Sequence, residues 1–493
     1  MRLRHLIPPL LLGALLPGCT DLDLTNPNQI STGTFWQTEA QATQGINATY
    51  NALLNNGTYG RWLGFAYDIR SDIGTSTSPW ADLANFNKFT LTDYDFEVSR
   101  EIWQHHYQGI FRANQVVANV PNVSMDAATR DRIVGEARFI RALLYFNLLN
   151  LYGGNIPLII TPSLPADRPA SAGAAAVWAQ IETDLTEAAP ALPAAYAGAD
   201  VGRATSGAAL ALLGKVLLQQ RKWGEASTVL QQVIDSDQYD LMPNYADNFT
   251  AMAENNQESV FEVQFGDRTL LASGVRGLNI AKMIGPCGPG FCDGLPTRWY
   301  FDQFRQERTV DDQPDPRLDA TLYYNRPGGM DVYGQSFTDR YGATSDAIYF
   351  KKWGEYYIPG DQDWDAAINN RVIRYADVLL MQAEALNEQD QPANAAPLVN
   401  EVRARVNMPA ISTTLNQAQM RERILRERMF ELGLEGSRWL DLERQNLLTA
   451  ANLETLRNHD SDFDFFTVGK SEVLPIPVSE INLNPNVHQN TNW

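Results

Sequence analysis

Apolar residues recur at helical spacing along much of the chain, and the pattern is clearest between residues 127 and 152. Ile133, Ala137, Ile140 and Leu144 follow one another at steps of three and four residues, which places them on one face of a helix. Other large apolar residues of this stretch lie off that face, so a second face is apolar too. The pattern therefore predicts a helix buried between neighbouring elements.

Local signals mark where helices begin and end. Gly153-Gly154 can adopt the left-handed conformation that closes a helix, and Pro157 prevents its continuation. The residues from Thr38 to Gln41 have the pattern of a capping box that opens a helix running to about Leu54. The residues from Thr414 to Gln417 have the same pattern and predict a second helix start.

Two stretches have the spacing of tetratricopeptide repeats, which are pairs of antiparallel helices. Residues 203–236 place Gly214 twelve residues before Ala226, and a second stretch places Ala383 twelve residues before Ala395. Small residues at these positions let paired helices approach closely. Further helices are predicted over residues 103–120, 127–152 and 174–192, which gives three or four helix pairs in total.

Two other stretches have no sustained helical period. Residues 61–99 are rich in aromatic, Asp and Asn residues, and residues 240–370 combine many glycines and prolines with short β-prone runs such as SVFEVQF. The sequence thus predicts a mostly α fold, a tetratricopeptide-like helical-repeat scaffold with an irregular, loop-rich insertion containing short β-strands. Loops held by a rigid scaffold commonly carry the binding residues of a protein.

The N-terminus has the composition of a targeting signal. Arg2 and Arg4 precede an apolar stretch that ends at Leu16-Pro17-Gly18-Cys19, which resembles a bacterial lipoprotein cleavage site. We predict a signal peptide over residues 1–18, lipidation of Cys19 and a polar tether over 19–36. The alternative is an ordinary secretory signal followed by an incidental cysteine.

Charge and cysteine content narrow the range of functions. The formal net charge of −19 makes the surface repel phosphate backbones, so no nucleic acid partner is expected. The cysteines that remain after Cys19 are Cys287 and Cys292, separated by Gly-Pro-Gly-Phe, and an oxidising compartment would let them form a disulfide. A metal site is the rival interpretation, but every histidine lies more than a hundred residues away in sequence.

Several motifs together resemble the SusD/RagB family of outer-membrane lipoproteins. These are EARFIRALLYFNLLNLYGGNIPLI, RYADVLLMQAEALNE, RERMFELGLEGSRWLDLER and LPIPVSEINLNPNVHQN, which occur in the family's order and spacing. YDIRSD and IWQHHYQGIFRANQVVANV extend the similarity into the N-terminal half. The resemblance covers nearly the whole chain after the signal peptide and divides it into a SusD-like helical region, 37–239, and a SusD/RagB region, 240–493.

The resemblance implies a location, a partner and an activity. Members of this family are lipid-anchored on the outer face of the outer membrane, have a SusD-like α/α superhelix and close over a SusC-like TonB-dependent β-barrel transporter. They bind glycans, or sometimes peptides, and do not cleave them. Asp21 and Asp23 resemble the acidic signal for surface export that follows the lipidated cysteine.

Sugar recognition requires aromatic rings that stack on pyranose C–H faces, and polar groups that bind hydroxyls. In the family, ligand contacts commonly come from the first irregular stretch and from the insertion. The candidate ligand-binding residues are therefore Trp62, Arg70, Asp72, Trp80, Asn85 and Asn87 in the first stretch, and Trp299, Tyr300, Trp353 and Tyr356 in the insertion. The alternative is that these aromatic residues pack the loops onto the scaffold.

The sequence contains no recognisable catalytic motif, and we predict no catalytic residue, no cofactor and no metal ligand. A glycosidase needs two carboxylates at a defined separation, but 58 acidic residues offer too many pairs to single one out. Asp311-Asp312 and Asp361-Gln362-Asp363 could at most bind calcium. Beside a ligand-binding subunit of a nutrient importer, two alternatives remain: a surface adaptor without a small ligand, and a surface glycoside hydrolase.

The predicted lipid anchor can be tested directly. Replacing Cys19 with Ala removes the thiol that would carry the lipid, so the Cys19→Ala protein should leave the membrane fraction and become soluble. Cell fractionation followed by immunoblotting measures this. Persistence of the variant in the membrane fraction would contradict the anchor.

Overall fold

The structure is a computed structural model that describes residues 35–164, 166–266, 269 and 276–493. The predicted signal peptide, Cys19 and nearly all of the tether lie outside the described residues. Among the described residues, the structure contains no helix with the length and apolar character needed to span a membrane.

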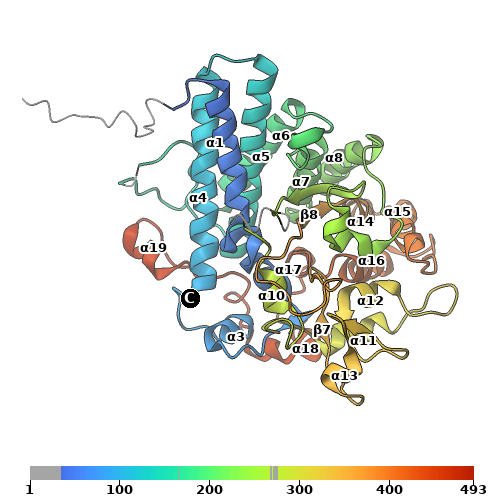
Figure 1. The fold of residues 1–493 in the computed structure, drawn as a ribbon. Coiled ribbons are helices and arrows are strands. Elements are labelled where there is room, and N and C mark those ends of the chain that lie inside the picture. The colour runs from blue at the N-terminus through green and yellow to red at the C-terminus, as the bar shows by residue number, and fades with distance from the viewer. Residues whose placement is uncertain (1–34, 165, 267–268, 270–275) are drawn as a thin grey trace, which may run out of the picture.

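The fold is mostly helical, as predicted. At its N-terminal side α1 (Glu39–Asn51), α4 (Glu97–Asn119), α5 (Ala127–Tyr152) and α6 (Ala174–Ala188) lie next to one another (Figure 1). The helical layer continues through α7 (Ser206–Gln219), α8 (Trp223–Asp235), α14 (Tyr375–Glu388), α15 (Pro392–Arg405) and α16 (Gln417–Leu432). Shorter helices complete the C-terminal part: α17 (Arg438–Arg444), α18 (Leu453–His459) and α19 (Val478–Leu483).

Helix α5 is buried on more than one side, as its two apolar faces predict. It packs against α4 on one flank and α6 on the other, and also contacts α1. Every residue from Gly135 to Tyr152 is buried except Arg138, which is half-buried. Gly153 ends the helix at φ +68°, a conformation that favours glycine. The sequence therefore identified the central helix of the scaffold correctly.

Both predicted tetratricopeptide-like pairs are present. The first consists of α7 and α8, and the second of α14 and α15. A Cβ atom on Gly214 would lie 2.4 Å from the Leu230 side chain, so a larger residue would force Leu230 to move from its place between α7 and α8. Ala383 and Ala395 are fully buried at the equivalent positions of the second pair. Because α14 also packs on α8 and α16, the two pairs form one stack.

Two helix boundaries differ from the prediction. Helix α4 begins at Glu97 rather than near Trp103, because Val98 and Ile102 already face the core one turn earlier. The second capping box is made by Asn416 and Gln419, not by Thr414 and Gln417: the Asn416 side chain accepts from the Gln419 amide, and the Gln419 side chain accepts from the Asn416 amide. Asn is as effective an N-cap as Thr, so the sequence pattern fitted both registers.

The insertion combines short helices with four small antiparallel strand pairs. The strands are β1 (Gly74–Thr75) with β3 (Leu295–Pro296), β2 (Ser259–Val263) with β8 (Asn370–Arg374), β4 (Leu322–Tyr323) with β7 (Tyr349–Phe350), and β5 (Asp331–Val332) with β6 (Gln335–Ser336). The helices are α10 (Ile280–Ile284), α11 (Arg298–Phe304), α12 (Pro316–Thr321) and α13 (Phe337–Tyr341). The β1–β3 pair joins the first irregular stretch to the insertion.

Residues 61–99 are more ordered than the sequence suggested. The stretch contains the short helix α2 (Trp62–Gly64), one π-helical turn (Phe65–Ile69) and α3 (Ala81–Asn87). Leu83, Phe86 and Phe96 are buried, so the aromatic residues that gave the stretch its loop-like composition serve largely as packing. These helices and turns are too short to give a sustained helical period, which is why the sequence did not predict them.

Buried charges connect the insertion to the helical stack. Glu431 on α16 is fully buried and pairs with Arg374 at the end of β8 (3.0 Å), Arg405 at the end of α15 (2.5 Å) and Arg317 on α12 (3.3 Å). Burial opposes ionisation of Glu431, but the charges of the three arginines outweigh it and hold its pKa well below its usual range. Each arginine has at least one further carboxylate partner.

Removal of this central charge should destabilise the protein strongly. Glu431→Gln leaves three buried guanidinium groups without the carboxylate that they share, so the free energy of unfolding should fall by about 3–5 kcal/mol. Denaturant unfolding followed by circular dichroism measures the loss. Glu422→Gln, at an exposed position of the same helix, is the control and should change stability by less than about 0.5 kcal/mol. Equal effects of the two substitutions would contradict the role of Glu431.

Candidate functional site

Three exposed aromatic side chains come from separate parts of the chain. Trp80 precedes α3, Phe291 lies between the two cysteines, and Trp364 precedes β8; their side chains are 37%, 50% and 40% exposed. The ring centroids of Phe291 and Trp364 are 6.0 Å apart, with their planes at 43°. Exposed aromatic side chains that gather on one surface can mark a binding site. We refer to Trp80, Phe291 and Trp364 as the aromatic surface.

Arg61 and Trp62 connect the members of the aromatic surface. Trp80 packs edge-on against Trp62, with centroids 6.1 Å apart. The guanidinium carbon of Arg61 lies 4.6 Å from the Trp62 ring centre and 4.7 Å from that of Trp364. Such cation–π contacts stabilise a ring in one position. Trp80, Trp62, Arg61, Trp364 and Phe291 thus form one continuous chain of contacts.

The electrostatics of Arg61 follow from its partial burial. Burial lowers the pKa of Arg61, and the nearby carboxylates of Glu101, Glu97 and Asp365 oppose that shift. Its Nη1 lies 3.7 Å from Glu97 Oε1, and its Nε has no hydrogen-bond partner within the described part of the chain. Glu101 accepts a hydrogen bond from the Trp62 indole at 2.7 Å.

Polar groups lie beside the exposed rings. Asn279 donates to the Trp364 carbonyl and to Asp365 Oδ1, both at 2.9 Å. Lys282 Nζ lies 5.2 Å from the Phe291 ring centre and donates to the Pro289 carbonyl. Aromatic faces next to amide, carboxylate and ammonium groups suit a ligand that has both C–H faces and hydroxyl groups.

Four of the ten predicted binding residues keep exposed surface. Trp80 is the most exposed. Asn85 is half-buried and accepts from the Thr90 hydroxyl, and Tyr356 is half-buried with Lys351 Nζ 4.3 Å from its ring centre. Trp299 is half-buried and stacks on His459 with centroids 3.6 Å apart. Only Trp80 belongs to the aromatic surface.

The other six predicted residues are buried, which corrects the sequence-based assignment: Trp62, Arg70, Asp72, Asn87, Tyr300 and Trp353. Each makes at least one hydrogen bond within the protein. Arg70 donates to the Ser471 carbonyl, Asn87 to Ile69, Tyr300 to Met429 and Trp353 to Leu434. A ring or amide without exposed surface cannot contact a ligand, so in this structure these side chains support the fold. Of these six buried residues, Trp62 is the one that contacts the aromatic surface, through the ring of Trp80.

Sequence reasoning missed Arg61, Phe291 and Trp364. Phe291 lies within the Cys287–Cys292 motif, which indicates a disulfide rather than a binding residue. Trp364 follows Asp361-Gln362-Asp363, which indicates at most calcium binding. Phe291 and Trp364 share with Trp80 the signal of an aromatic residue in a polar loop. No local pattern indicates that the three loops meet.

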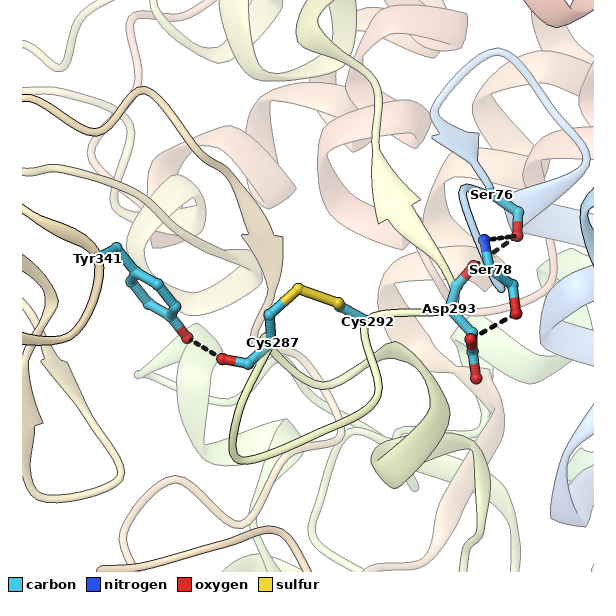
Figure 2. Close-up of a disulfide and its surroundings, with 6 residues drawn as sticks. All are labelled: Ser76, Ser78, Cys287, Cys292, Asp293 and Tyr341. Carbon is cyan, nitrogen blue, oxygen red and sulfur yellow. Dashed lines mark hydrogen bonds between the residues drawn. A yellow bond between two sulfur atoms is a disulfide. The ribbon is translucent and has the colours of Figure 1, made fainter. Parts of the chain in front are cut away.

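The predicted disulfide is present between Cys287 and Cys292 (Figure 2). Among the described residues, no group of three or more His, Cys, Asp or Glu side chains is arranged to hold a metal ion. Of the acidic residues considered for calcium, Asp312 pairs with Arg308 and Asp311 accepts from Asn407.

Three histidines, His105, His106 and His459, are engaged in the fold. His105 accepts a hydrogen bond from the Gly57 amide, and His106 is buried, with burial lowering its pKa to about 3. His459 Nδ1 lies 2.9 Å from Asp72 Oδ2. Asp72 is also held by both nitrogens of the Arg438 fork at 2.7 Å; burial opposes its ionisation, but Arg438 and His459 hold its pKa well below its usual range.

Comparison with known proteins gives consistent matches over most of the chain. The model of the SusD family matches residues 257–493, and a model described as starch-binding and associating with the outer membrane matches residues 22–218. SusD-like protein P25 of Formosa agariphila is 27% identical and covers 92% of both chains. The starch-binding protein SusD of Bacteroides thetaiotaomicron is 25% identical over 73% of this chain and 72% of its own.

Solved structures extend the comparison to three dimensions. A laminarin-binding SusD-like protein is 30% identical, covers 93% of this chain and 100% of its own, and superposes with a TM-score of 0.74. A SusD superfamily protein from Bacteroides vulgatus is 26% identical with the same coverage and a TM-score of 0.83.

The carboxyl group of Asp460, next to His459, should make stability depend on pH. Burial and the charges of Asp462 and Asp72 raise the pKa of Asp460 to about 7, against about 3.9 in an unfolded chain. The folded protein therefore holds a proton that the unfolded chain lacks, so this contribution is complete below about pH 4 and is lost as pH rises through about 7.

Asp460→Asn should accordingly flatten the decline of unfolding free energy between about pH 4 and about pH 7, measured by denaturant titration. Asp464→Asn, at a neighbouring position with a 61% exposed side chain, is the matched control and should leave the decline unchanged. An unaltered slope in Asp460→Asn would contradict the assignment.

Proposed function

This chain belongs to the SusD family, and from that premise we propose that it captures oligosaccharides at the bacterial surface without cleaving them. The observation that carries the proposal is the aromatic surface. Trp80, Phe291 and Trp364 expose their rings in one contact chain, beside groups that can bind hydroxyls. The 30% identical relative described as laminarin-binding supports a glycan ligand.

The arrangement of the rings supports an extended ligand rather than a single sugar. The tilt of 43° between Phe291 and Trp364 prevents both rings from facing one flat surface. An oligosaccharide whose successive units turn relative to one another could stack on each ring. Trp80 is held by Trp62 and Trp364 by Arg61, so these two rings lose little conformational freedom on binding, which favours affinity.

The proposal includes delivery to a membrane transporter. We propose that Cys19 anchors the protein to the outer membrane and that a SusC-like TonB-dependent β-barrel receives the captured ligand. Family membership supports both statements, and so does the description of the N-terminal match as associating with the outer membrane. Within the chain, we propose that region 37–239 supplies Trp80 and region 240–493 supplies Phe291 and Trp364.

Two carboxylates near the rings, those of Asp365 and Asp293, accept hydrogen bonds that hold the loops, which supports binding without cleavage. Asp365 Oδ1 already accepts from Asn279 and from the Gly277 amide, and Asp293 accepts from the Ser78 hydroxyl. Glycoside hydrolysis needs one carboxyl free to give a proton and another free to act on the anomeric carbon or water. Incubation with laminarin and starch oligosaccharides should therefore give binding but no shorter products by chromatography.

Substitution of Trp80 tests the aromatic surface. Trp80→Ala removes a stacking ring and should weaken binding of an oligosaccharide from laminarin or starch by about 1–3 kcal/mol, measured by isothermal titration calorimetry. Phe111→Ala on α4 is the matched control, because that side chain is 43% exposed but lies outside the aromatic surface.

The two variants have distinct expected outcomes. Phe111→Ala should bind as the unsubstituted protein does. Unchanged affinity in a folded Trp80→Ala protein would exclude Trp80 from the site. If the protein binds peptides but no glycan, the ligand is a peptide rather than an oligosaccharide. If it binds neither, the result favours the alternative of a surface adaptor without a small ligand.

A further inference from the structure

The turn closed by Cys287 and Cys292 contacts both of the other segments that carry exposed aromatic rings. We propose that this turn is a positioning element for the aromatic surface, and that Asp293 is the residue through which it sets the position of Trp80. The inference rests on the proposed function as far as affinity is concerned. Its structural part can be measured without any ligand.

A relay of hydrogen bonds connects Asp293 to Trp80. Figure 2 shows the part of this relay that runs from Ser76 and Ser78 to Asp293. The Trp80 amide donates to the Ser78 hydroxyl at 3.1 Å, and that hydroxyl donates to Asp293 Oδ1 at 2.6 Å. The Ser76 hydroxyl donates to the Asp293 carbonyl at 2.6 Å and accepts from the Ser78 amide at 3.3 Å. The two hydrogen bonds that hold the loop of Ser76 and Ser78 are therefore both accepted by Asp293.

The relay is buried although the tryptophan is exposed. Ser76, Ser78 and Asp293 are 0%, 7% and 7% exposed. Thr77 and Pro79, between them, are exposed. Buried hydrogen bonds with no competing water hold a geometry more firmly than exposed ones. The loop is thus fixed on its inner side while Trp80 faces solvent.

The turn that carries Asp293 is itself held from several sides. Besides the disulfide, the Cys292 amide donates to Gly285 at 3.0 Å, the Asp293 amide to Met283 at 2.8 Å, and the Tyr341 hydroxyl to the Cys287 carbonyl at 2.8 Å. Cys292 has φ +49°, in the left-handed region that a non-glycine residue rarely adopts. Such a conformation persists only when its surroundings determine it, and the disulfide is one of those constraints.

The same turn also contacts the segment that carries Trp364. The Gln362 amide donates to the Pro289 carbonyl at 3.1 Å. Gln362 is buried, and its side chain accepts from the Tyr333 hydroxyl and from the Glu355 amide. The disulfide turn therefore lies between the Trp80 loop and the Trp364 segment, with hydrogen bonds to each, and presents Phe291 itself.

This geometry lets Asp293 position Trp80 specifically, beyond any contribution that it makes to the stability of the fold. A side-chain oxygen at position 293, from a carboxylate or a carboxamide, accepts the hydrogen bond of the Ser78 hydroxyl and so fixes its orientation. The oriented hydroxyl in turn accepts from the Trp80 amide. Without this side-chain oxygen, Trp80 would become ordered only when the ligand binds. The conformational entropy lost in that ordering would lower the affinity. Asp293→Asn keeps an oxygen acceptor, whereas Asp293→Ala removes it.

The decisive experiment is a double-mutant cycle on oligosaccharide affinity. Asp293→Ala should lower the affinity for a laminarin oligosaccharide about fivefold to thirtyfold when Trp80 is present, and less than about twofold in the Trp80→Ala background. Asp293→Asn should restore most of the affinity. Thr77→Ala, at an exposed position of the same loop, is the matched control and should have no effect. Equal losses in both backgrounds would overturn the positioning role.

A second measurement needs no ligand. In protein labelled with 5-fluorotryptophan, the ¹⁹F resonance of Trp80 is the one missing from Trp80→Phe. It should shift or broaden in Asp293→Ala and in the double variant Cys287→Ser/Cys292→Ser, but not in Asp293→Asn or Thr77→Ala. An unchanged Trp80 resonance in folded Asp293→Ala would overturn the inference, even if the double cysteine variant fails to fold.

The two measurements separate the inference from the proposed function. If the unsubstituted protein binds neither laminarin nor starch oligosaccharides but the Trp80 resonance responds as expected, the glycan function fails and the positioning of Trp80 stands. If the protein binds glycan but neither affinity nor resonance responds to Asp293→Ala, the function stands and the positioning role fails.

Discussion

The structure depends on a set of buried ion pairs centred on Glu431. Three arginines from α12, β8 and α15 converge on this one carboxylate of α16, and Arg374 and Arg405 also share Glu258. Burying an unpaired charge costs several kcal/mol, so none of these groups is tolerated unless its partners are in place. The helical stack and the insertion therefore constrain each other's packing.

This mutual constraint explains how loops can form a defined recognition surface. Arg374 is the last residue of β8, which pairs with β2. This strand pair holds the C-terminal end of the insertion against the helices α7 and α14. The segment that carries Trp364 leads directly into β8, and β1 pairs with β3 near the disulfide turn. Exposed rings on otherwise irregular segments are thereby held at fixed separations. A preorganised surface binds its ligand without first paying to order itself.

The predictions from sequence succeeded where short-range chemistry decides the outcome. Helix α5, the pairs α7–α8 and α14–α15, and the capping box of α1 depend on spacing within a few turns of helix, and all are present. The prediction was weaker for binding residues. Trp62, Tyr300 and Trp353 look like recognition residues by composition, yet they are buried, because aromatic rings are drawn to a core as readily as to a ligand.

By itself, the sequence determined the helical scaffold, the disulfide and the family resemblance, since periodicity, small residues at helix contacts and motif order are all local properties. Only the tertiary structure decided which aromatic residues stay exposed and which of them meet. Trp80 and Trp364 are far apart along the chain and are brought together through Trp62 and Arg61. Which side chain remains at the surface depends on what the rest of the fold packs over it, and that is a property of the whole chain.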